Sequence, residues 1–235
     1  MRVTWTVLTL FGVESAVLAL AVLPAVLFWE WHFHWRIAPA WLRVLVLAAS
    51  FVPAYLLFAT ALMVLSAAAA RLLGWRTPAA AELRITDLDW ALLRWVRYLV
   101  CTHLVRVFAG GLLRASPLWT LCLRLNGARI GRGVWVNSTA LMDHNLLDFG
   151  DGVVIGSDVH LSGHTVEGGV VRTAPVRVGT GATIGVGSVV GIGVEIGAGT
   201  QVGALSYVPK HTHLEPGGIY GGVPVRRLDE GVPGP

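Results

Sequence analysis

Histidine is the side chain of this 235-residue chain best suited to proton transfer, and five of its eight histidines lie in the C-terminal half. A neutral imidazole near its unperturbed pKa can take a proton from a hydroxyl or an amine, which prepares that group to attack a thioester. His164 stands out because it follows Gly163 where a regular repeat stops. Such a histidine is either a general base or an exposed residue of a turn.

An aliphatic residue returns every six positions from Val178 to Leu214. This period fits neither a helix nor a single strand, but it fits an all-β solenoid of triangular coils, each about eighteen residues long. We expect the aliphatic side chains to point inward, the glycine after each to suit a corner, and the small residue four places on to fill the interior. The aliphatic set is Val178, Ile184, Val190, Ile196, Val202, Val208 and Leu214, and the small set is Ala182, Ser188, Val194, Thr200 and Ser206.

A less regular form of the repeat precedes this run. Its inward residues are expected to be Ile130, Val136 and Met142, then, after one extra residue, Phe149, Ile155 and Leu161. Between Leu161 and Val178 the repeat is lost, which predicts a loop that leaves the solenoid. Insertions of this kind often form the binding face.

The same register predicts neighbours for His164. The hexapeptide of Met142 should lie one coil below that of Leu161, so His144 and Asn145 are expected about 4.8 Å below His164. His160 is expected to face outward. Because His160 and His164 lack a third partner at a matching coil position, we expect no metal site.

The N-terminal region is too apolar for an ordinary soluble domain. Arg2 and Glu30 bracket 27 residues whose only charge is Glu14, and 44–70 is a second run of 27 residues without any charge. About 20 apolar residues suffice to cross a bilayer. We therefore predict a two-span transmembrane anchor over residues 1–70, in contact with membrane lipids.

Positive charge predicts which way the anchor faces. Residues 1–126 carry 11 Arg against 5 acids, and eight of these arginines follow the second apolar run. By the positive-inside rule, the C-terminal domain lies on the cytoplasmic side of the cytoplasmic membrane. The arginines would meet anionic headgroups. No nucleic-acid-binding motif accompanies them, so we expect no nucleic-acid partner.

Three further segments complete the predicted organisation. Residues 71–126 form a basic connector in which Thr86 caps a helix that reaches about Ala109 and ends at Gly110-Gly111. This helix is expected to lie in the membrane interface, with a third span as the alternative. A short helix follows Ser116-Pro117. The solenoid occupies 127–228, and 229–235 is expected to be a disordered tail.

Several motifs of the C-terminal half resemble a known group. F-G-D-G-V-V-I-G-S-D-V-H-L-S-G-H-T-V-E-G-G-V-V, P-V-R-V-G-T-G-A-T-I-G, G-A-L-S-Y-V-P-K and G-G-V-P-V-R are similar to hexapeptide-repeat acyltransferases. They most resemble the membrane-linked C-terminal domains of poly-amino-acid synthetases and the polysaccharide O-acetyltransferases. The resemblance implies a left-handed parallel β-helix that works as a homotrimer, with its active site between subunits.

The resemblance also implies roles for individual residues. His164 occupies the position of a loop histidine that acts as general base, and the acid that the group often carries before its G-D motif is Asn145 here. Coenzyme A, most often as acetyl-CoA, would lie along the groove of the later coils. The residues that match its binding places are Ala204, Ser206, Lys210 and Arg226.

Two classes of function remain open from the sequence. The first is an anchored acyltransferase that moves an acyl group from an acyl-CoA to a hydroxyl or amine of a small or membrane-proximal acceptor, with aminoacyl transfer from a carrier-protein thioester as its variant. The second is a non-catalytic trimeric scaffold in which the loop histidine is incidental.

Overall fold

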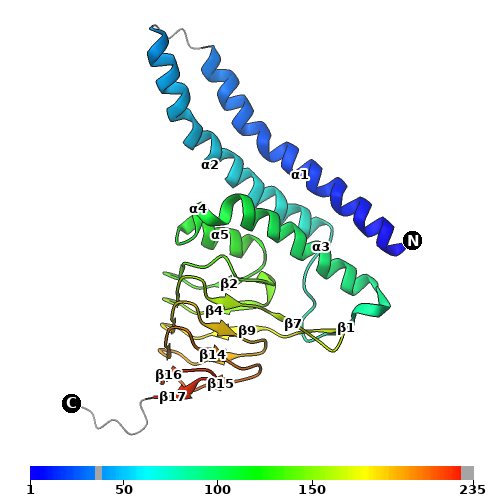
Figure 1. The fold of residues 1–235 in the computed structure, drawn as a ribbon, viewed down its shortest axis with the longest axis vertical. Helices are drawn as coiled ribbons and strands as arrows, with labels where there is room; N and C mark the ends of the chain where they lie inside the picture. Colours follow the sequence, from blue (N-terminus) through cyan, green and yellow to red (C-terminus); the bar gives the residue numbers. More distant parts are fainter. Residues whose placement is uncertain (35–38, 229–235) are drawn as a thin grey trace, which may run out of the picture.

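The computed structural model describes residues 1–34 and 39–228. Helices occupy the N-terminal half and rest on one end of a stack of short strands formed by the C-terminal half (Figure 1). The tail predicted to be disordered, 229–235, lies outside the described residues.

The first two helices form an antiparallel pair. Helix α1 runs over Arg2–Phe33 and α2 over Ala40–Leu72. The pair buries small residues, among them Ala21 and Ala59, so the two backbones approach closely. By length and composition both helices could cross a membrane, and so could Trp90–Leu113.

The third apolar helix differs from its prediction at both ends. Helix α3 (Trp90–Val105) is capped by Asp89, whose carboxylate accepts a hydrogen bond from the Leu92 N–H at 2.7 Å, and Thr86 lies in a preceding 3₁₀ turn, η1 (Ile85–Asp87). The expected break at Gly110-Gly111 is wrong, because the chain continues through a π-helical turn, η2 (Arg106–Gly110), into α4 (Gly111–Leu113).

Tight packing under this turn explains why glycine occurs without ending the helix. A Cβ on Gly110 would lie 3.0 Å from the Thr139 side chain. The last helix, α5 (Pro117–Leu125), starts as predicted, with the Ser116 hydroxyl accepting from the Trp119 N–H at 3.4 Å. The Trp119 indole is buried and donates to the Ser138 carbonyl at 2.9 Å. Helix α5 thus packs against the first coil.

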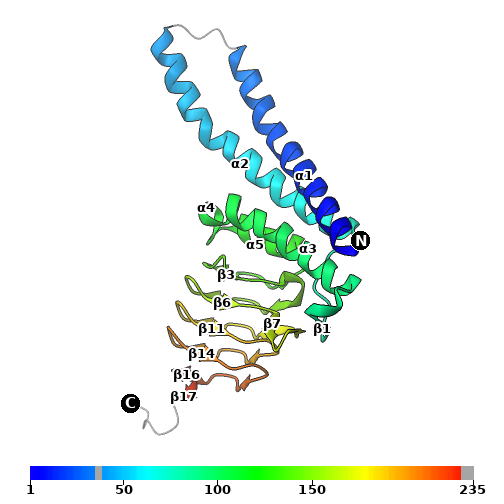
Figure 2. The same cartoon turned by 45° about the vertical axis from the view of Figure 1, so that its right-hand side comes forward.

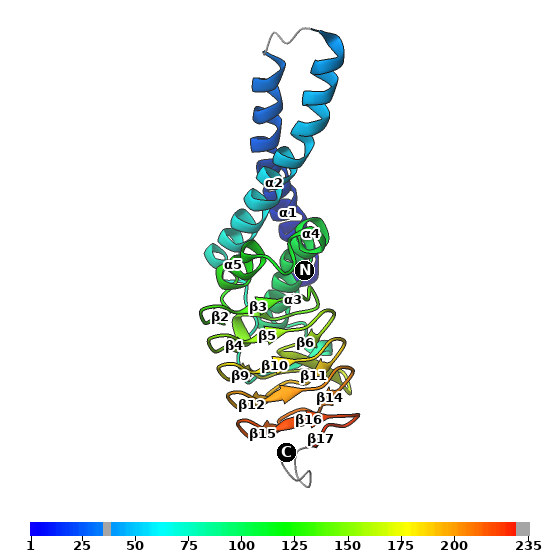
Figure 3. The same cartoon turned by 90° about the vertical axis from the view of Figure 1, so that its left-hand side faces the viewer.

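The strands stack on three faces, one coil above another (Figure 3), and pair in parallel except for β17, which is antiparallel to β16. The pairing of Ile184 with Val202 and of Val190 with Val208 sets one coil at eighteen residues. The first face holds β2 (Arg129–Ile130), β4 (Leu147–Phe149), β9 (Val176–Val178), β12 (Glu195–Ile196) and β15 (His213–Leu214). The second holds β3 (Trp135–Val136), β5 (Val154–Ile155), β10 (Thr183–Ile184), β13 (Gln201–Val202), β16 (Ile219–Gly221) and β17 (Arg226–Arg227), and the third β6 (His160–Leu161), β11 (Val189–Val190) and β14 (Tyr207–Val208).

The predicted interior of the regular coils is confirmed. All seven aliphatic positions from Val178 to Leu214 are buried, and so are all five small positions between them. Glycine serves two different purposes in this interior. At Gly193, φ is +67°, whereas a Cβ on Gly185 would lie 2.4 Å from the backbone nitrogen of Ala204 in the next coil.

The first coil departs from the predicted register by one residue. Leu141, and not Met142, is buried and forms a parallel bridge with Leu161. The cause is a tight corner at Ser138, whose hydroxyl donates to the Val159 carbonyl at 2.8 Å and accepts from the backbone N–H two residues later at 3.0 Å. The 3₁₀ turn η3 (His144–Leu146) then restores the spacing.

The predicted loop between Leu161 and Val178 leaves the stack as an antiparallel hairpin. Strand β7 (His164–Glu167) pairs with β8 (Val170–Thr173), and β8 pairs with β1 (Glu82–Arg84) from the connector. This small sheet lies at one edge of the stack (Figure 2). The connector and the hairpin therefore hold each other in place.

Strand β11 offers a matched test of this interior. Val190 is 1% exposed and its neighbour Val189 is 40% exposed. We expect Val190→Ala to lower the free energy of unfolding by about 2 kcal/mol, because two buried methyl groups are lost and a cavity remains. Val189→Ala should change it by less than about 0.5 kcal/mol. Thermal unfolding in detergent measures both, and equal effects would contradict the inward assignment.

Candidate functional site

His164 and Asp143 form a buried pair at the base of the hairpin. His164 is the first residue of β7, and its Nδ1 lies 2.5 Å from Oδ2 of Asp143. Asp143 has a φ of +52°, a left-handed conformation that aspartate tolerates better than most residues, and its side chain is fully buried. The turn that ends the first coil thus directs a carboxylate at the loop histidine.

Three other groups donate hydrogen bonds to this carboxylate. The Thr77 hydroxyl lies 2.6 Å and the Trp95 indole N–H 3.2 Å from Oδ1. The Ser162 hydroxyl lies 3.2 Å from Oδ2. Burial by itself raises the pKa of Asp143, but the bonds from His164, Thr77 and Trp95 and the charge of His164 outweigh it and hold that pKa below its ordinary value. Asp143 is therefore ionised at neutral pH.

An ionised Asp143 determines how His164 presents its ring. A carboxylate can only accept, so Nδ1 of His164 carries the proton and Nε2 of the neutral ring has a free lone pair. The Trp95 indole packs edge-on against the imidazole at 5.0 Å between ring centroids. The His164 side chain remains 16% exposed. In this arrangement Nε2 of His164 can accept a proton while Asp143 holds the ring in place.

The sequence predicted His144 and Asn145 as neighbours of His164, but both side chains bond to other residues. Nε2 of His144 donates to the Leu141 carbonyl at 3.0 Å, and the Asn145 side chain bonds the backbone of Thr77 in both directions, at 3.2 and 2.8 Å. Within 1–34 and 39–228, the structure joins neither side chain to His164 by a hydrogen bond.

The sequence reasoning missed Asp143. The predicted register put His144 and Asn145 beside His164, whereas the residue that lies there is Asp143, one position before His144. The one-residue register error at Leu141 accounts for the shift. Thr77 and Trp95 were also missed, because no local pattern shows that the connector and α3 reach the first coil.

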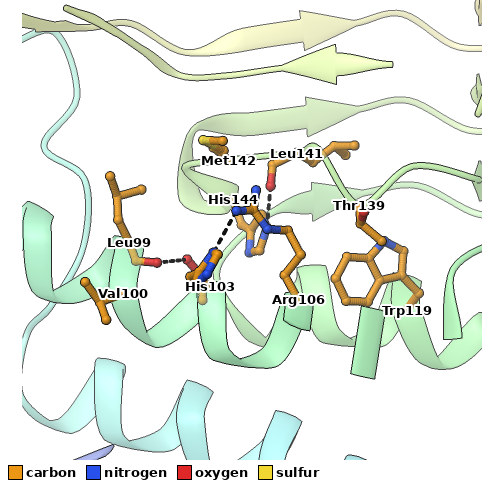
Figure 4. Close-up of a pocket in the computed structure, with 10 residues that line it drawn as sticks. Leu99, Val100, His103, Arg106, Trp119, Thr139, Leu141, Met142 and His144 are labelled. Atoms are coloured by element: carbon orange, nitrogen blue, oxygen red, sulfur yellow. Dashed lines mark hydrogen bonds between the residues drawn. The ribbon is translucent and has the colours of Figure 1, made fainter. Parts of the chain in front are cut away.

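A cavity of about 390 Å³ lies between α3 and the first coil. Figure 4 shows His103, Arg106 and His144 together on its wall, with Leu99 and other apolar side chains around them. An Nη of Arg106 donates to Nδ1 of His103 at 2.7 Å. His144 lines this cavity, but its lining includes neither Asp143 nor His164.

The residues predicted to hold coenzyme A fall into two places. Ser206 accepts from the Gly222 N–H at 3.2 Å, and Arg226 pairs with Gly221, so Ala204, Ser206 and Arg226 share the last coils. Lys210 instead binds Glu167 at the end of β7, with Nζ at 2.5 and 2.7 Å from its two carboxylate oxygens. In the described part of the chain, no cluster of three potential metal ligands occurs.

The comparisons with known proteins find similarity among solved structures. No family model matches this chain, and no curated protein matches it. The chain is similar to the hexapeptide-repeat acetyltransferase VCA0836 of Vibrio cholerae complexed with acetyl coenzyme A, at 26% identity and a TM-score of 0.40. The match covers 43% of this chain and 59% of that one, so this chain spans less than two thirds of that protein.

Two other solved structures are similar over longer stretches. A galactoside acetyltransferase in complex with coenzyme A matches at 24% identity and a TM-score of 0.39, over 48% of this chain and 70% of that one. A maltose O-acetyltransferase from Clostridium difficile 630 matches at 19% identity and a TM-score of 0.47, over 63% and 91%. The predicted resemblance to hexapeptide-repeat acyltransferases is confirmed as a similarity.

Acid should destabilise the fold through His144. Burial lowers the pKa of His144 to about 4, whereas an unfolded histidine titrates near 6.5. Between these values the unfolded chain binds a proton that the folded chain does not, so stability falls as the pH is lowered from 6.5 towards 4. We expect a loss on the order of 2–3 kcal/mol from this residue.

Thermal unfolding midpoints at pH 7 and pH 4.5 test this expectation. In His144→Gln the amide can still donate to the Leu141 carbonyl but does not titrate, so the variant should lose less stability than the wild type on acidification. The exposed His213 supplies the control, since His213→Gln should behave like the wild type. An equal acid loss in all three proteins would show that His144 does not carry the effect.

Proposed function

We propose that this protein is a membrane-anchored acyltransferase that moves an acetyl or similar acyl group from an acyl-CoA to a hydroxyl or amine. The observation that carries the proposal is the 2.5 Å contact between His164 and a buried, ionised Asp143. Burying the charge of Asp143 carries a desolvation penalty that an apolar side chain would not have, so a purely structural role does not explain it. The carboxylate instead fixes the tautomer of a partly exposed histidine.

Each residue of the site would have a separate role in the proposed reaction. Nε2 of His164 would take the proton from the attacking hydroxyl or amine, while Asp143 stabilises the imidazolium that forms. The imidazolium would then return the proton to the departing thiolate. Backbone N–H groups beside the groove would stabilise the negative charge on the carbonyl oxygen. Ser162 and Trp95 act as positioning residues, since they touch the pair from two sides.

The donor would lie along the outside of the later coils. Ala204 and Arg226 are exposed there, whereas Ser206 is buried in the coil interior and would not touch the donor. Lys210 would reach an anionic part of the ligand from its place beside the hairpin. On this proposal the stack is a left-handed β-helix that forms a trimer, with the site between subunits. The acyl donor supplies the activated carbonyl, and the chain supplies the base and the binding groups.

The anchor would keep the site next to the membrane. Three helices are apolar enough to span it. With α1 and α2 as the two spans, the arginines after α2 would favour the cytoplasmic side for the coils by the positive-inside rule. The anchor would also suit a membrane-proximal acceptor, such as a lipid-linked one.

Thiol release from acetyl-CoA in detergent tests the base. His164→Ala should lower kcat by about 10²- to 10⁴-fold, because the acceptor then lacks its general base. Asp143→Asn should lower kcat on a similar scale, since the amide no longer fixes the Nδ1–H tautomer. His160→Gln, on the neighbouring strand β6, is the control and should retain activity. Equal rates in all four proteins, with no binding of coenzyme A, would favour the non-catalytic scaffold.

The contact of Lys210 with Glu167 tests the donor site. Lys210→Gln should raise KM for acetyl-CoA several-fold, because a cation for the donor's phosphates is lost. Glu167→Gln should lower KM, since Lys210 is then released from its carboxylate. The control is Arg177→Gln, which removes an ion pair with Glu195 on the first face. If only the carrier-protein variant is correct, acetyl-CoA will not serve as a donor for the wild type or for any of these variants.

A further inference from the structure

Two adjoining cavities open on the other flank of α3, beside the end of α2. They measure about 470 and 520 Å³ and share four lining residues, Gly74, Arg76, Arg94 and Asn145. Together they form one groove, which we call the arginine groove. It is separate from the 390 Å³ cavity, with which it shares no lining residue.

The arginine groove is strongly cationic. Among the residues that the structure describes, four arginines line it and no carboxylate does. Most of their donors remain available. Arg71 donates to the Arg124 carbonyl at 3.3 Å and Arg94 to the Trp90 carbonyl at 3.2 Å. The four are Arg71, Arg76, Arg94 and Arg129, of which Arg129 has an acidic neighbour, Asp148, at 3.7 Å. Such a set matches a phosphate or diphosphate, whose oxygens accept from several guanidinium forks.

The walls of the groove connect this charge to the anchor. Ala67 and Ala70 of the last turns of α2 line it, with the rings of Trp75 and Tyr98. Arg71 lies in the last turn of the same helix. A ligand held here would place an anionic group among the arginines and an apolar part along α2, which is apolar enough to span a membrane.

The groove also reaches the pair formed by His164 and Asp143. Thr77 lines it, and the Thr77 hydroxyl donates to Asp143 at 2.6 Å. Asn145 lines it as well and holds the Thr77 backbone. Only Thr77 and Asp143 therefore stand between the groove and His164 along this path of hydrogen bonds.

We propose that the arginine groove binds the phosphate or diphosphate group of a membrane-borne lipid. That this lipid is the acyl acceptor rests on the proposed function, but the binding itself does not. A free phosphate and a lipid headgroup would offer the same anionic oxygens to the arginines. The apolar wall that α2 contributes favours the lipid.

Lipid retention by the full chain in nonionic detergent tests the proposal, with native mass spectrometry as the readout. The probes are dioleoyl phosphatidic acid, dioleoyl phosphatidylcholine and inorganic pyrophosphate. We expect phosphatidic acid to bind tighter than phosphatidylcholine. The double variant Arg76→Gln/Arg94→Gln should weaken phosphatidic acid binding by about ten-fold or more, since two charge-assisted contacts are lost.

The control removes the same charge elsewhere. Arg84→Gln/Arg132→Gln replaces two exposed arginines outside the groove and should bind phosphatidic acid like the wild type. Equal weakening by both double variants would overturn the proposal, because binding would then depend on the overall positive charge and not on the groove. Equal retention of phosphatidic acid and phosphatidylcholine would also overturn it. Tighter binding of pyrophosphate than of phosphatidic acid would overturn the lipid-borne part.

The outcome is independent of acyl transfer. His164→Ala should retain phosphatidic acid like the wild type, because His164 does not line the groove. If activity is absent from every protein while the groove variants still lose the lipid, the proposed function fails and the binding site stands. A thermal unfolding midpoint confirms that each variant is folded.

Discussion

The buried carboxylate of Asp143 is the interaction on which the arrangement of this protein depends. A charge without solvent must be matched by donors, and each donor comes from a different part of the chain. Thr77 belongs to the connector, Trp95 to α3, Ser162 to a coil corner and His164 to the hairpin. Moving any of these parts would leave the charge short of a partner. Asp143 thus joins the helical half to the coil half, together with the pairing of β8 with β1 and the bond from Trp119 to Ser138.

The coils supply the rigid frame around that residue. Aliphatic side chains from three faces fill a narrow interior, and glycines such as Gly185 let successive coils approach within contact distance. Interiors packed to this density have little freedom to shift. The turn that carries Asp143 and the strand that carries His164 belong to adjacent coils, joined by the bridge between Leu141 and Leu161. Their spacing is therefore fixed by stacking.

The repeat made most of this frame predictable, and its failure in the first coil shows the limit. Where each hexapeptide has a single aliphatic residue, the six-residue period alone identifies which side chain points inward. In L-M-D-H-N two apolar residues are adjacent, so either Leu141 or Met142 could point inward by sequence alone. The corner at Ser138 decides for Leu141, and that choice moves the residue facing His164 from His144 to Asp143. The donors Thr77 and Trp95 lie 66 and 48 residues from Asp143, beyond any local pattern.

The hairpin fixes the distance between two residues of the proposed reaction, His164 and Lys210. Strand β7 begins at His164 and ends at Glu167, which holds Lys210. Three residue steps of a strand span about 10 Å, so His164 and the ammonium group of Lys210 lie near opposite ends of one short strand. Pairing of β8 with β1 from the connector keeps that element rigid. An extended donor with its thioester near His164 would bring its more distant anionic part towards Lys210. In the proposed reaction, the length of strand β7 would therefore set the distance between the proposed base, His164, and the proposed donor-binding residue, Lys210.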